Sequence, residues 1–345
     1  SLDNTGDVIY LRSPQNRIIH TVSYTDVWYQ NELKKDGGWT LEMKDTKNPC
    51  NGFSNWVASV DTKGGTPGKK NSVDGINTDN TAPRLLRAYA TDSVNVVLVF
   101  DEPMDIVKAA VAANYNISDA IGQPQTANAI APAYDRVAVK LNVPLVRNKV
   151  YTVTVSALTD CVGNATGTKN TAKLGLASAT DSFDVVINEI LFNPISSGVD
   201  YVELYNRTTK VIDLKNIYIA NRNSAGTISS ITQLSTETNL LFPEEFIVVS
   251  SDASIVKRDF IALNLDAFVD VGSTPSYNDD KGDVIILNEQ GKIVDELVYS
   301  DKWHFKLIDN KEGVALERID YHAATQNQDN WHSAATSVGY GTPTY

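Results

Sequence analysis

The sequence has few of the residues that most metal-binding and redox proteins depend on. Its 345 residues include two cysteines, two methionines and four histidines. Cys50 and Cys161 lie too far apart to form a zinc-binding motif. Two interpretations remain open for them. They are either unpaired structural thiols or a Cys50–Cys161 disulfide, which would suit an oxidising compartment.

Long hydrophobic runs are also missing. No apolar run approaches the ~18 residues that a membrane-spanning helix requires, and no signal peptide opens the chain. Because 42% of the residues are hydrophobic, the chain can still bury substantial cores. Its length suits two or three domains. We therefore expect globular domains and no membrane span.

Positive charge is scarce in the last part of the chain. The net charge is −12, and residues 185–345 carry 12 basic against 23 acidic residues, so this segment contributes −11 of it. Such a surface repels phosphate backbones, and no basic stripe offsets it. We therefore expect no nucleic-acid partner. The acidity is explained by solubility or, alternatively, by cation binding.

Signatures of catalysis are absent as well. The sequence has no HExxH or GxSxG motif. The four histidines do not recur at matching positions of the repeat described below, so they are interpreted as polar surface residues: His20, His304, His322 and His332. These observations favour a protein without a catalytic centre.

One pair of carboxylates keeps a hydrolase hypothesis open. Glu189 and Glu203 lie in two β-rich runs of one predicted domain. A glycosidase needs two carboxylates facing each other across a cleft. The simpler interpretation is a structural pair, or hydrogen bonding to the neighbouring Asn188 or Tyr201.

What the sequence does contain is an internal repeat. "GDVIYLRSPQNRIIHTVSY" begins at Gly6, and "GDVIILNEQGKIVDELVY" begins at Gly282. The correspondence continues through Tyr24/Tyr299, Trp28/Trp303, Glu42/Glu317, Trp56/Trp331 and "GTP" at 65–67 and 341–343. Aromatic residues shared by both copies are most simply fold anchors. The repeat therefore predicts a duplicated domain.

The pattern of strands predicts an all-β protein of tandem immunoglobulin-like β-sandwiches. Strand-forming runs occur at 185–194, 200–206, 216–220 and 245–250 ahead of the second repeat copy, and at 84–90, 95–100, 136–141 and 150–158 between the copies. Residues 106–115 are expected to form one short helix. The predicted domains are 1–72, 73–184 and 185–345. The first lacks the strands that precede the second copy, so we expect a half domain.

Two family resemblances follow from these residues. "VVINEILFNP", "DYVELYN", "GDVIIL", "ALERID" and "GTP" occur in an order that resembles the bacterial lamin-tail domain, completely over 185–345 and as a C-terminal half over 1–72. "FDEPMD" and "TDCVGN" in 73–184 resemble the bacterial immunoglobulin-like domains of surface-layer proteins. The resemblance implies a secreted or cell-surface protein and supplies no catalytic residues.

The function expected from this combination is a non-enzymatic structural, adhesion or interaction module. Its partners would be proteins or glycans at the cell surface. Because exposed sheet edges invite pairing, residues 1–72 are expected to pack on the neighbouring domain or, alternatively, to self-associate with a second copy of the chain. The alternative is a carbohydrate- or calcium-binding accessory region of a larger extracellular hydrolase. Both ends of the chain look trimmed from a longer repetitive protein.

Candidate ligand sites are few. Calcium-binding candidates are Asp101, Asp105 and Asp160 in the middle domain, and Asn278 and Asp280 in an acidic turn of the last domain. Ordinary Asx-rich turns and loop solvation are the simpler interpretation. Trp39 has no aromatic counterpart in the second copy, where Val314 takes its place. It is therefore the best candidate for a surface contact with a ligand.

Overall fold

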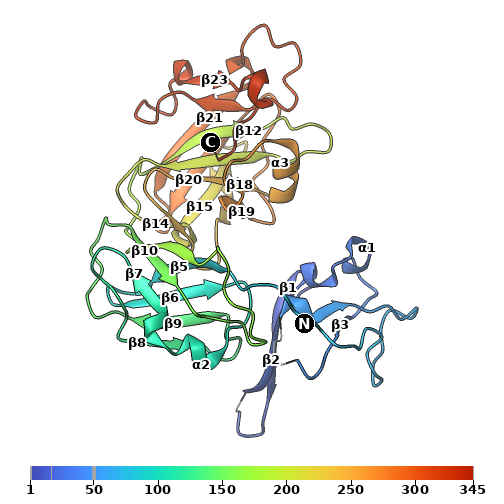
Figure 1. The fold of residues 1–345 in the computed structure, drawn as a ribbon. Coiled ribbons are helices and arrows are strands. Elements are labelled where there is room, and N and C mark those ends of the chain that lie inside the picture. Colours follow the sequence, from blue (N-terminus) through green and yellow to red (C-terminus); the bar gives the residue numbers. More distant parts are fainter. Residues whose placement is uncertain (1, 17, 49–51, 345) are drawn as a thin grey trace. The chain divides into compact units, whose positions relative to one another are not determined.

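The computed structural model describes residues 2–16, 18–48 and 52–344. The chain divides into two compact units, one made of Ser1–Val146 with Tyr151–Leu174 and the other of Arg147–Val150 with Gly175–Tyr345. Strands organised in antiparallel sheets dominate both units (Figure 1), so the predicted all-β class is confirmed. The predicted domain boundaries at 72 and 184 stay predictions.

The larger sheet of the C-terminal unit has six strands in the order β19–β18–β13–β12–β22–β23. They are β12 (Val185–Leu191), β13 (Tyr201–Asn206), β18 (Phe246–Ser250), β19 (Phe268–Asp270), β22 (Leu316–Arg318) and β23 (Trp331–Ser333). Neighbours are antiparallel except β18 and β19, which are parallel. The strands predicted at 185–194, 200–206 and 245–250 are therefore confirmed.

A second sheet of four strands, in the order β16–β15–β20–β21, belongs to the same unit. It contains β15 (Ile217–Arg222), β16 (Ile228–Gln233), β20 (Lys281–Asn288) and β21 (Ile293–Ser300). Shorter elements are β14 (Ile212–Asp213), β17 (Leu240–Leu241), α3 (Ala253–Asp259) and the 3-10 turns η4 (Leu214–Asn216), η5 (Asp301–Trp303), η6 (Gln328–Asn330) and η7 (Thr336–Val338).

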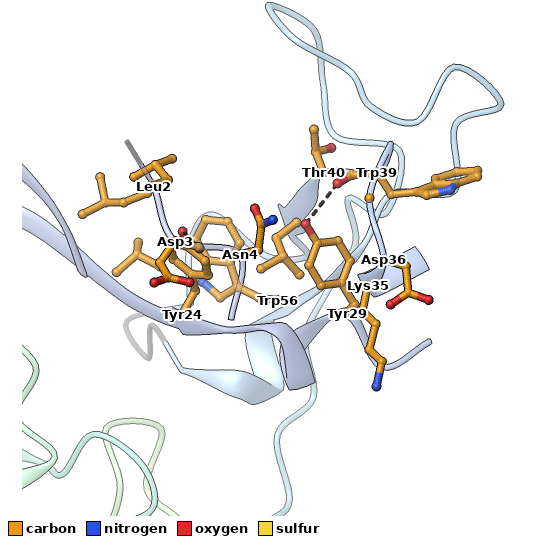
Figure 2. Close-up of a pocket in the computed structure, with 14 residues that line it drawn as sticks. Leu2, Asp3, Asn4, Tyr24, Tyr29, Lys35, Asp36, Trp39, Thr40 and Trp56 are labelled. Atoms are coloured by element: carbon orange, nitrogen blue, oxygen red, sulfur yellow. Dashed lines mark hydrogen bonds between the residues drawn. The ribbon is translucent and has the colours of Figure 1, made fainter. Parts of the chain in front are cut away.

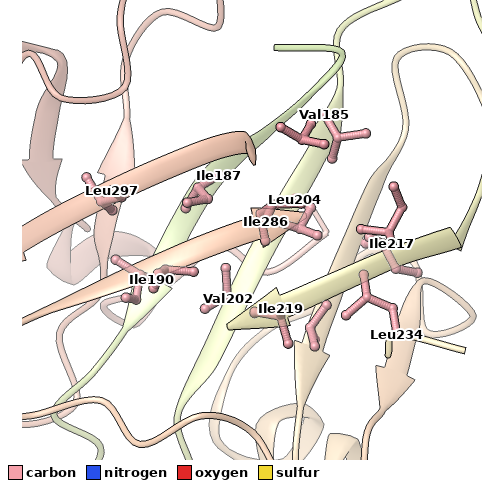
Figure 3. Packing of buried hydrophobic residues seen from close by; sticks show 14 of the residues in the cluster. Val185, Ile187, Ile190, Val202, Leu204, Ile217, Ile219, Leu234, Ile286 and Leu297 are labelled. Atoms are coloured by element: carbon pink, nitrogen blue, oxygen red, sulfur yellow. The ribbon is translucent and has the colours of Figure 1, made fainter. Parts of the chain in front are cut away.

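The core of this unit lies between its two sheets. Figure 3 shows Ile190 and Val202 of the six-stranded sheet close to Ile219 and Ile286 of the four-stranded sheet. All seven residues of β12 are buried, and a smaller apolar cluster near α3 covers part of the outer face of the six-stranded sheet. Val185, Ile187 and Ile190 of this strand therefore belong to the core between the sheets, whereas Leu191 belongs to the cluster near α3.

Residues 73–174, here named the immunoglobulin-like region, also contain two sheets. One has the order β5–β6–β9–β8 and contains β5 (Leu85–Ala90), β6 (Asn95–Phe100), β8 (Thr126–Ala129) and β9 (Arg136–Lys140). The other has the order β11–β10–β7 and contains β7 (Tyr115–Ile117), β10 (Tyr151–Val155) and β11 (Thr171–Leu174). The strands predicted in this region at 84–90, 95–100, 136–141 and 150–158 are confirmed.

The single helix predicted at 106–115 is wrong over most of its length. Helix α2 covers only Ile106–Ala109, η3 covers Ala112–Asn114, and Tyr115 already begins β7. Tyr115 is completely buried, and its hydroxyl donates to the carbonyl of Ala109. Pairing of β7 with β10 therefore overrides the local helical pattern.

Residues 1–72 form two small antiparallel ladders, β1–β2 and β3–β4. The elements are β1 (Gly6–Arg12), β2 (Ile18–Thr25), η1 (Asp26–Tyr29), α1 (Glu32–Lys35), β3 (Leu41–Met43), η2 (Phe53–Asn55) and β4 (Trp56–Ala58). Apart from α1, this order repeats β20, β21, η5, β22, η6 and β23. The two hairpins differ in burial: the apolar side chains of β1 are exposed, whereas those of β20 are buried.

The segment that follows residue 71 is attached to β3 and to the residues just after it. Ser72 donates to the Glu42 carboxylate through both its amide and its hydroxyl, at 2.7 Å each. The Gly75 amide donates to the carbonyl of Lys44, and the Asn77 amide donates to the Asp45 carboxylate. The chain leaving residues 1–72 is therefore held against them.

No helix in the described ranges is both long and apolar enough to cross a membrane.

Candidate functional site

The two glutamates of the hydrolase hypothesis lie side by side. Glu189 on β12 is the cross-strand partner of Glu203 on β13, and on its other side it is the partner of Glu317 on β22. Directly opposed residues of an antiparallel pair project from the same face of a sheet. The three side chains therefore form a carboxylate row, Glu203–Glu189–Glu317, across three strands.

Hydrogen-bond donors surround this row. The Tyr201 hydroxyl donates to Glu189 at 2.5 Å, and the Asn188 amide group donates to Glu203 at 2.7 Å. The backbone amide of Thr342 donates to Glu189 at 3.1 Å, and that of Thr344 donates to Glu203. The carboxylate oxygens are thus used by the fold itself.

The segment Gly341–Thr344, here named the closing segment, packs against the row. A Cβ at Gly341 would lie 2.6 Å from the Tyr201 hydroxyl, so only glycine allows this approach. The Thr342 hydroxyl donates to Glu317 at 2.7 Å, which links the third carboxylate to the segment. Both Glu189 and Glu203 are 0% exposed.

Burial changes the protonation of the row. Desolvation, followed by the neighbouring carboxylates, raises the pKa of Glu189 well above its usual range. Desolvation also raises the pKa of Glu203 to about 7. A raised carboxyl pKa is found in catalytic acids, but a catalytic acid must also reach its substrate. Fully buried carboxyls with partners from the fold have a structural use here.

A second carboxylate group lies in the immunoglobulin-like region. Asp79, Glu102 and Asp160 converge with their ligand-type oxygens within 4.8 Å of one another, the one such cluster in the described part of the chain. Asp79 lies near the start of the predicted domain 73–184, ahead of its first strand, and was not among the sequence candidates. No local sequence signal indicates that this residue meets the "FDEPMD" and "TDCVGN" loops.

The electrostatics of this acidic cluster are unfavourable when all three groups are ionised. Burial, then the charges of Asp160, Asp79 and Asp101, raise the pKa of Glu102 to about 8. Asp160 is fully buried and accepts hydrogen bonds from the amides of Val162, Gly163 and Asn164. The second oxygen of Asp160 accepts from the Asn164 side chain, and the two oxygens of Asp79 accept from Ser54 and Thr81, so both aspartates already serve the loops around them.

The other predicted calcium ligands have different roles. Asp101 forms an ion pair with Arg84 at 2.7 Å. Asp105 caps α2 by accepting from the amides of Val107 and Lys108 at 2.8 Å each. The structure thus separates Asp101 and Asp105 from the cluster that contains Asp160.

In the acidic turn of the C-terminal unit, Asn278 and Asp280 form hydrogen bonds with neighbouring parts of the protein. The carbonyl of Asn278 accepts from the Tyr299 hydroxyl at 3.0 Å. The Asp280 carboxylate accepts from the Lys281 amide, and its carbonyl accepts from Asp301. These contacts are those of a turn stabilised by Asx-type hydrogen bonds.

A groove of about 410 Å³ opens in residues 1–72 (Figure 2). Side chains of β2, β3 and β4 supply much of its lining, with Val22, Tyr24, Leu41 and Trp56 among them. The Tyr29 hydroxyl donates to the carbonyl of Trp39 at 3.0 Å and so holds the chain at one end of the groove. The groove is open, and aromatic and aliphatic side chains share its lining with Asp3, Asn4, Lys35, Asp36 and Thr40.

Trp39 lies at the rim of this groove and is half-buried. The ammonium of Lys34 sits 4.2 Å from the centre of its ring, in a cation–π contact. One face of the indole is therefore occupied within the protein. As a ligand contact, Trp39 stays a prediction.

The repeated tryptophans have unequal surroundings. Trp331 belongs to the core of the C-terminal unit, and Trp303 packs against that core. Their counterparts Trp56 and Trp28 lie with ring centroids 6.3 Å apart in residues 1–72. Trp28 is buried, whereas Trp56 lines the groove.

The prediction that all four histidines are surface residues is wrong for His304. This residue is 3% exposed, because it follows η5 and packs 5.6 Å from the Phe192 ring. Burial lowers the pKa of His304 to about 4. The other three are exposed or partly exposed, with His322 beside Arg207 and His332 beside Glu317.

The predicted Cys50–Cys161 disulfide falls partly outside the described residues, because Cys50 lies in the range 49–51. That pairing stays a prediction.

Comparison with protein families supports two of the predicted resemblances. Residues 178–301 match the family described as Lamin Tail Domain, and residues 77–178 match the family described as Bacterial Ig-like domain. Both are families of non-catalytic domains. Residues 1–72 and 302–345 fall outside both matches, so the half lamin-tail domain and the extension of the complete one to residue 345 stay predictions.

No curated protein matches the chain. Among solved structures, the N-terminal part of the bacterial S-layer protein SbsC is 18% identical over 49% of this chain and 40% of its own length, with a TM-score of 0.26. A DUF4876 family protein from Bacteroides thetaiotaomicron is 13% identical over 60% of this chain and 89% of its own, with a TM-score of 0.29. Adhesin InvE of Yersinia pseudotuberculosis is 12% identical over 69% and 66%, with a TM-score of 0.20. The chain spans about 40% of the S-layer protein.

Proposed function

We propose that this chain is a non-enzymatic module of a bacterial cell-surface protein, in which β-sandwich domains carry a protein-binding groove. The observation that supports this most directly is the contrast between two sites. The carboxylate row is buried under the closing segment, whereas the aromatic groove of residues 1–72 is open. Aromatic, concave and apolar surfaces are typical of binding sites.

The family matches support the surface location. Residues 77–178 match a bacterial immunoglobulin-like domain and residues 178–301 a lamin-tail domain, which favours two sandwich folds in succession along the sequence. Such arrays act as spacers when their domains have their own cores. The extensive core of residues 185–345 meets that requirement.

Display on intact cells tests the location. An epitope tag would be inserted at Asn223–Thr227, an exposed turn between β15 and β16, in the full gene of the source bacterium. We expect antibody binding and protease cleavage of the tag on intact cells. Detection only after lysis would overturn the proposal.

A carbohydrate-binding accessory role is the second candidate, because Trp39 and Tyr29 stand beside a groove of suitable size. A glycan array with the native chain and Trp39→Ala separates the two. Binding that this substitution abolishes would favour the accessory role. If the native chain binds no glycan on the array, the result favours a protein partner.

A further inference from the structure

The closing segment is anchored near both of its ends by contacts outside the carboxylate row. The Ala315 amide donates to the carbonyl of Tyr340 at 2.9 Å, and the Asn264 amide donates to the Thr344 hydroxyl at 3.0 Å. Between these anchors, the segment is attached to the six-stranded sheet by its hydrogen bonds to the row. The state of the row therefore affects how firmly the middle of the segment is held.

The hydroxyl of Thr342 lies between two carboxyl groups. It is 2.7 Å from Oε1 of Glu317 and 3.4 Å from Oε2 of Glu189. A hydroxyl has one proton to donate, and the shorter distance assigns that proton to Glu317. The other donors to Glu189, the Tyr201 hydroxyl and the Thr342 amide, both reach its Oε1. An ionised Glu189 would therefore have a buried Oε2 without a close donor, which is costly.

A proton on Oε2 of Glu189 removes this cost. The protonated carboxyl group can donate to a lone pair of the Thr342 hydroxyl, which itself donates to Glu317. Charge favours the same state, because Glu203 and Glu317 lie opposite Glu189 on its two neighbouring strands. Burial and then these neighbours raise the pKa of Glu189 well above its usual range.

The titratable groups around the row come from three strands and one loop. The Tyr201 hydroxyl of β13 has its own pKa raised well above the usual value by burial and then by the central carboxylate. Tyr321 has its pKa raised by burial and then by the charge of Glu203. His332 of β23 lies 3.6 Å from Oε2 of Glu317, at the outer end of the row. The closing segment itself, Gly341–Thr344, has no ionisable side chain.

We propose that the closing segment binds the sheet in a proton-dependent way, held while Glu189 carries a proton and released when that proton is lost. The closed form binds one proton more than the open form, in which water solvates the row, so a rise in pH favours opening. Opening would uncover Tyr201 and Phe260, because the backbone of Gly341 lies against both side chains. This conformational change is independent of the binding function proposed above.

Hydrogen exchange of single amides in the full chain tests the proposal. Protection of the Thr342 amide is expressed relative to the exchange rate of the unfolded chain at each pH. We expect this protection to fall about tenfold or more between about pH 7.5 and about pH 9, because one proton released on opening changes the equilibrium about tenfold per pH unit. Glu203, with a pKa of about 7, has mostly lost its proton before this range. Amides of β13 and β18 should change less than about threefold, since the opening is local.

Two variants identify the group that holds the proton. Glu189→Gln supplies an amide N–H that cannot be lost, so protection of the Thr342 amide should vary less than about threefold over the same range. Glu289→Gln, on an exposed turn, is the matched control and should keep the fall of about tenfold. The carboxyl carbon resonance of Glu189 in the native chain is a second measurement that needs no substitution. At about pH 7.5 it should have the position of a protonated acid.

Any of four results would overturn the proposal. One is a carboxylate-type resonance for Glu189 at about pH 7.5. Another is protection of the Thr342 amide that stays constant with pH in the native chain. A third is an equal fall in the amides of β13 and β18, because the whole unit would then open together. The fourth is a fall that persists in Glu189→Gln, because another group would then release the proton.

Discussion

Phe192 stacks on Tyr299 with ring centroids 4.3 Å apart and an interplanar angle of 25°. Phe192 immediately follows β12 and Tyr299 lies in β21, so the contact joins the two sheets of the C-terminal unit. The equivalent of Tyr299 in the first repeat copy is Tyr24, which faces a groove instead of a phenylalanine. We therefore expect Tyr299 to contribute more to the stability of its unit than Tyr24 does.

Phe192→Ala should lower the free energy of unfolding of the C-terminal unit by about 3–4 kcal/mol, because it opens a cavity in a fully buried core. Urea unfolding followed by residue-resolved exchange measures this. Tyr24→Ala serves as control and should cost less than about 1 kcal/mol. Equal losses at both positions would contradict the difference in packing.

Arg318→Met should destabilise the same unit by about 3–5 kcal/mol. The Arg318 guanidinium is completely buried, forms an ion pair with Asp295 and donates at 2.6 Å to both the Ile187 carbonyl and the Thr325 hydroxyl. Removing one partner leaves Asp295 buried without its cation. Arg258→Met, which breaks an exposed ion pair with Asp259, should cost at most about 1 kcal/mol. A loss below 1 kcal/mol for Arg318→Met would show that the pair is dispensable.

Stability of the C-terminal unit should fall as the pH rises from about 4.5 to about 7. The pKa of Glu203 is raised to about 7 by burial, so the folded state keeps a proton that the unfolded state loses near 4.5. A raised carboxyl pKa stabilises the fold below the unfolded value, and this contribution is lost as pH passes the folded value. Glu203→Gln should make the free energy of unfolding less dependent on pH, by up to about 1.4 kcal/mol per pH unit. Glu289→Gln, on an exposed turn, should leave it unchanged.

The acidic cluster makes an analogous prediction for the other unit. Because burial and neighbouring carboxylates raise the pKa of Glu102 to about 8, unfolding of the immunoglobulin-like region should become easier as pH rises from about 4.5 to 8. Thermal melting across this range should show the trend in the native chain and lose it in Glu102→Gln. A melting midpoint independent of pH in the native chain would refute the assignment.

The same thermal melting experiment also tests calcium binding by the acidic cluster. A cation held by Asp79 and Glu102 would displace the proton from Glu102, so millimolar calcium at pH 7 would raise the melting midpoint and Glu102→Gln would remove the rise. An unchanged midpoint would end the calcium hypothesis for these residues.

The sequence predicted most of the strands, because alternating β-branched runs and turn residues are local signals. It did not predict Asp79 in the acidic cluster, since that meeting depends on how loops from distant parts of the sequence converge. It placed Glu189 and Glu203 in strands of one domain but not side by side, because register depends on pairing and not on composition.

The repeat alignment also left one register unpredicted. In the alignment of the two repeat copies, Val8 corresponds to Val284 and Val22 corresponds to Leu297. Val284 pairs with Leu297 across the second hairpin, but in the first hairpin Val22 pairs with Ile9 and not with Val8. Five residues separate β1 from β2, and four separate β20 from β21. The extra residue in the first turn is taken up by a shift of one position along the ladder.

The closing segment has a consequence for the timing of folding in the cell. Glu189 and Glu203 receive donors from Thr342 and Thr344, which follow them by 153 and 141 residues. Until the ribosome has released residue 344, both carboxylates lack these amide partners. Their strands can pair earlier, but the unit can reach its final stability only after synthesis has passed this point. A nascent chain stalled earlier should accordingly remain sensitive to protease.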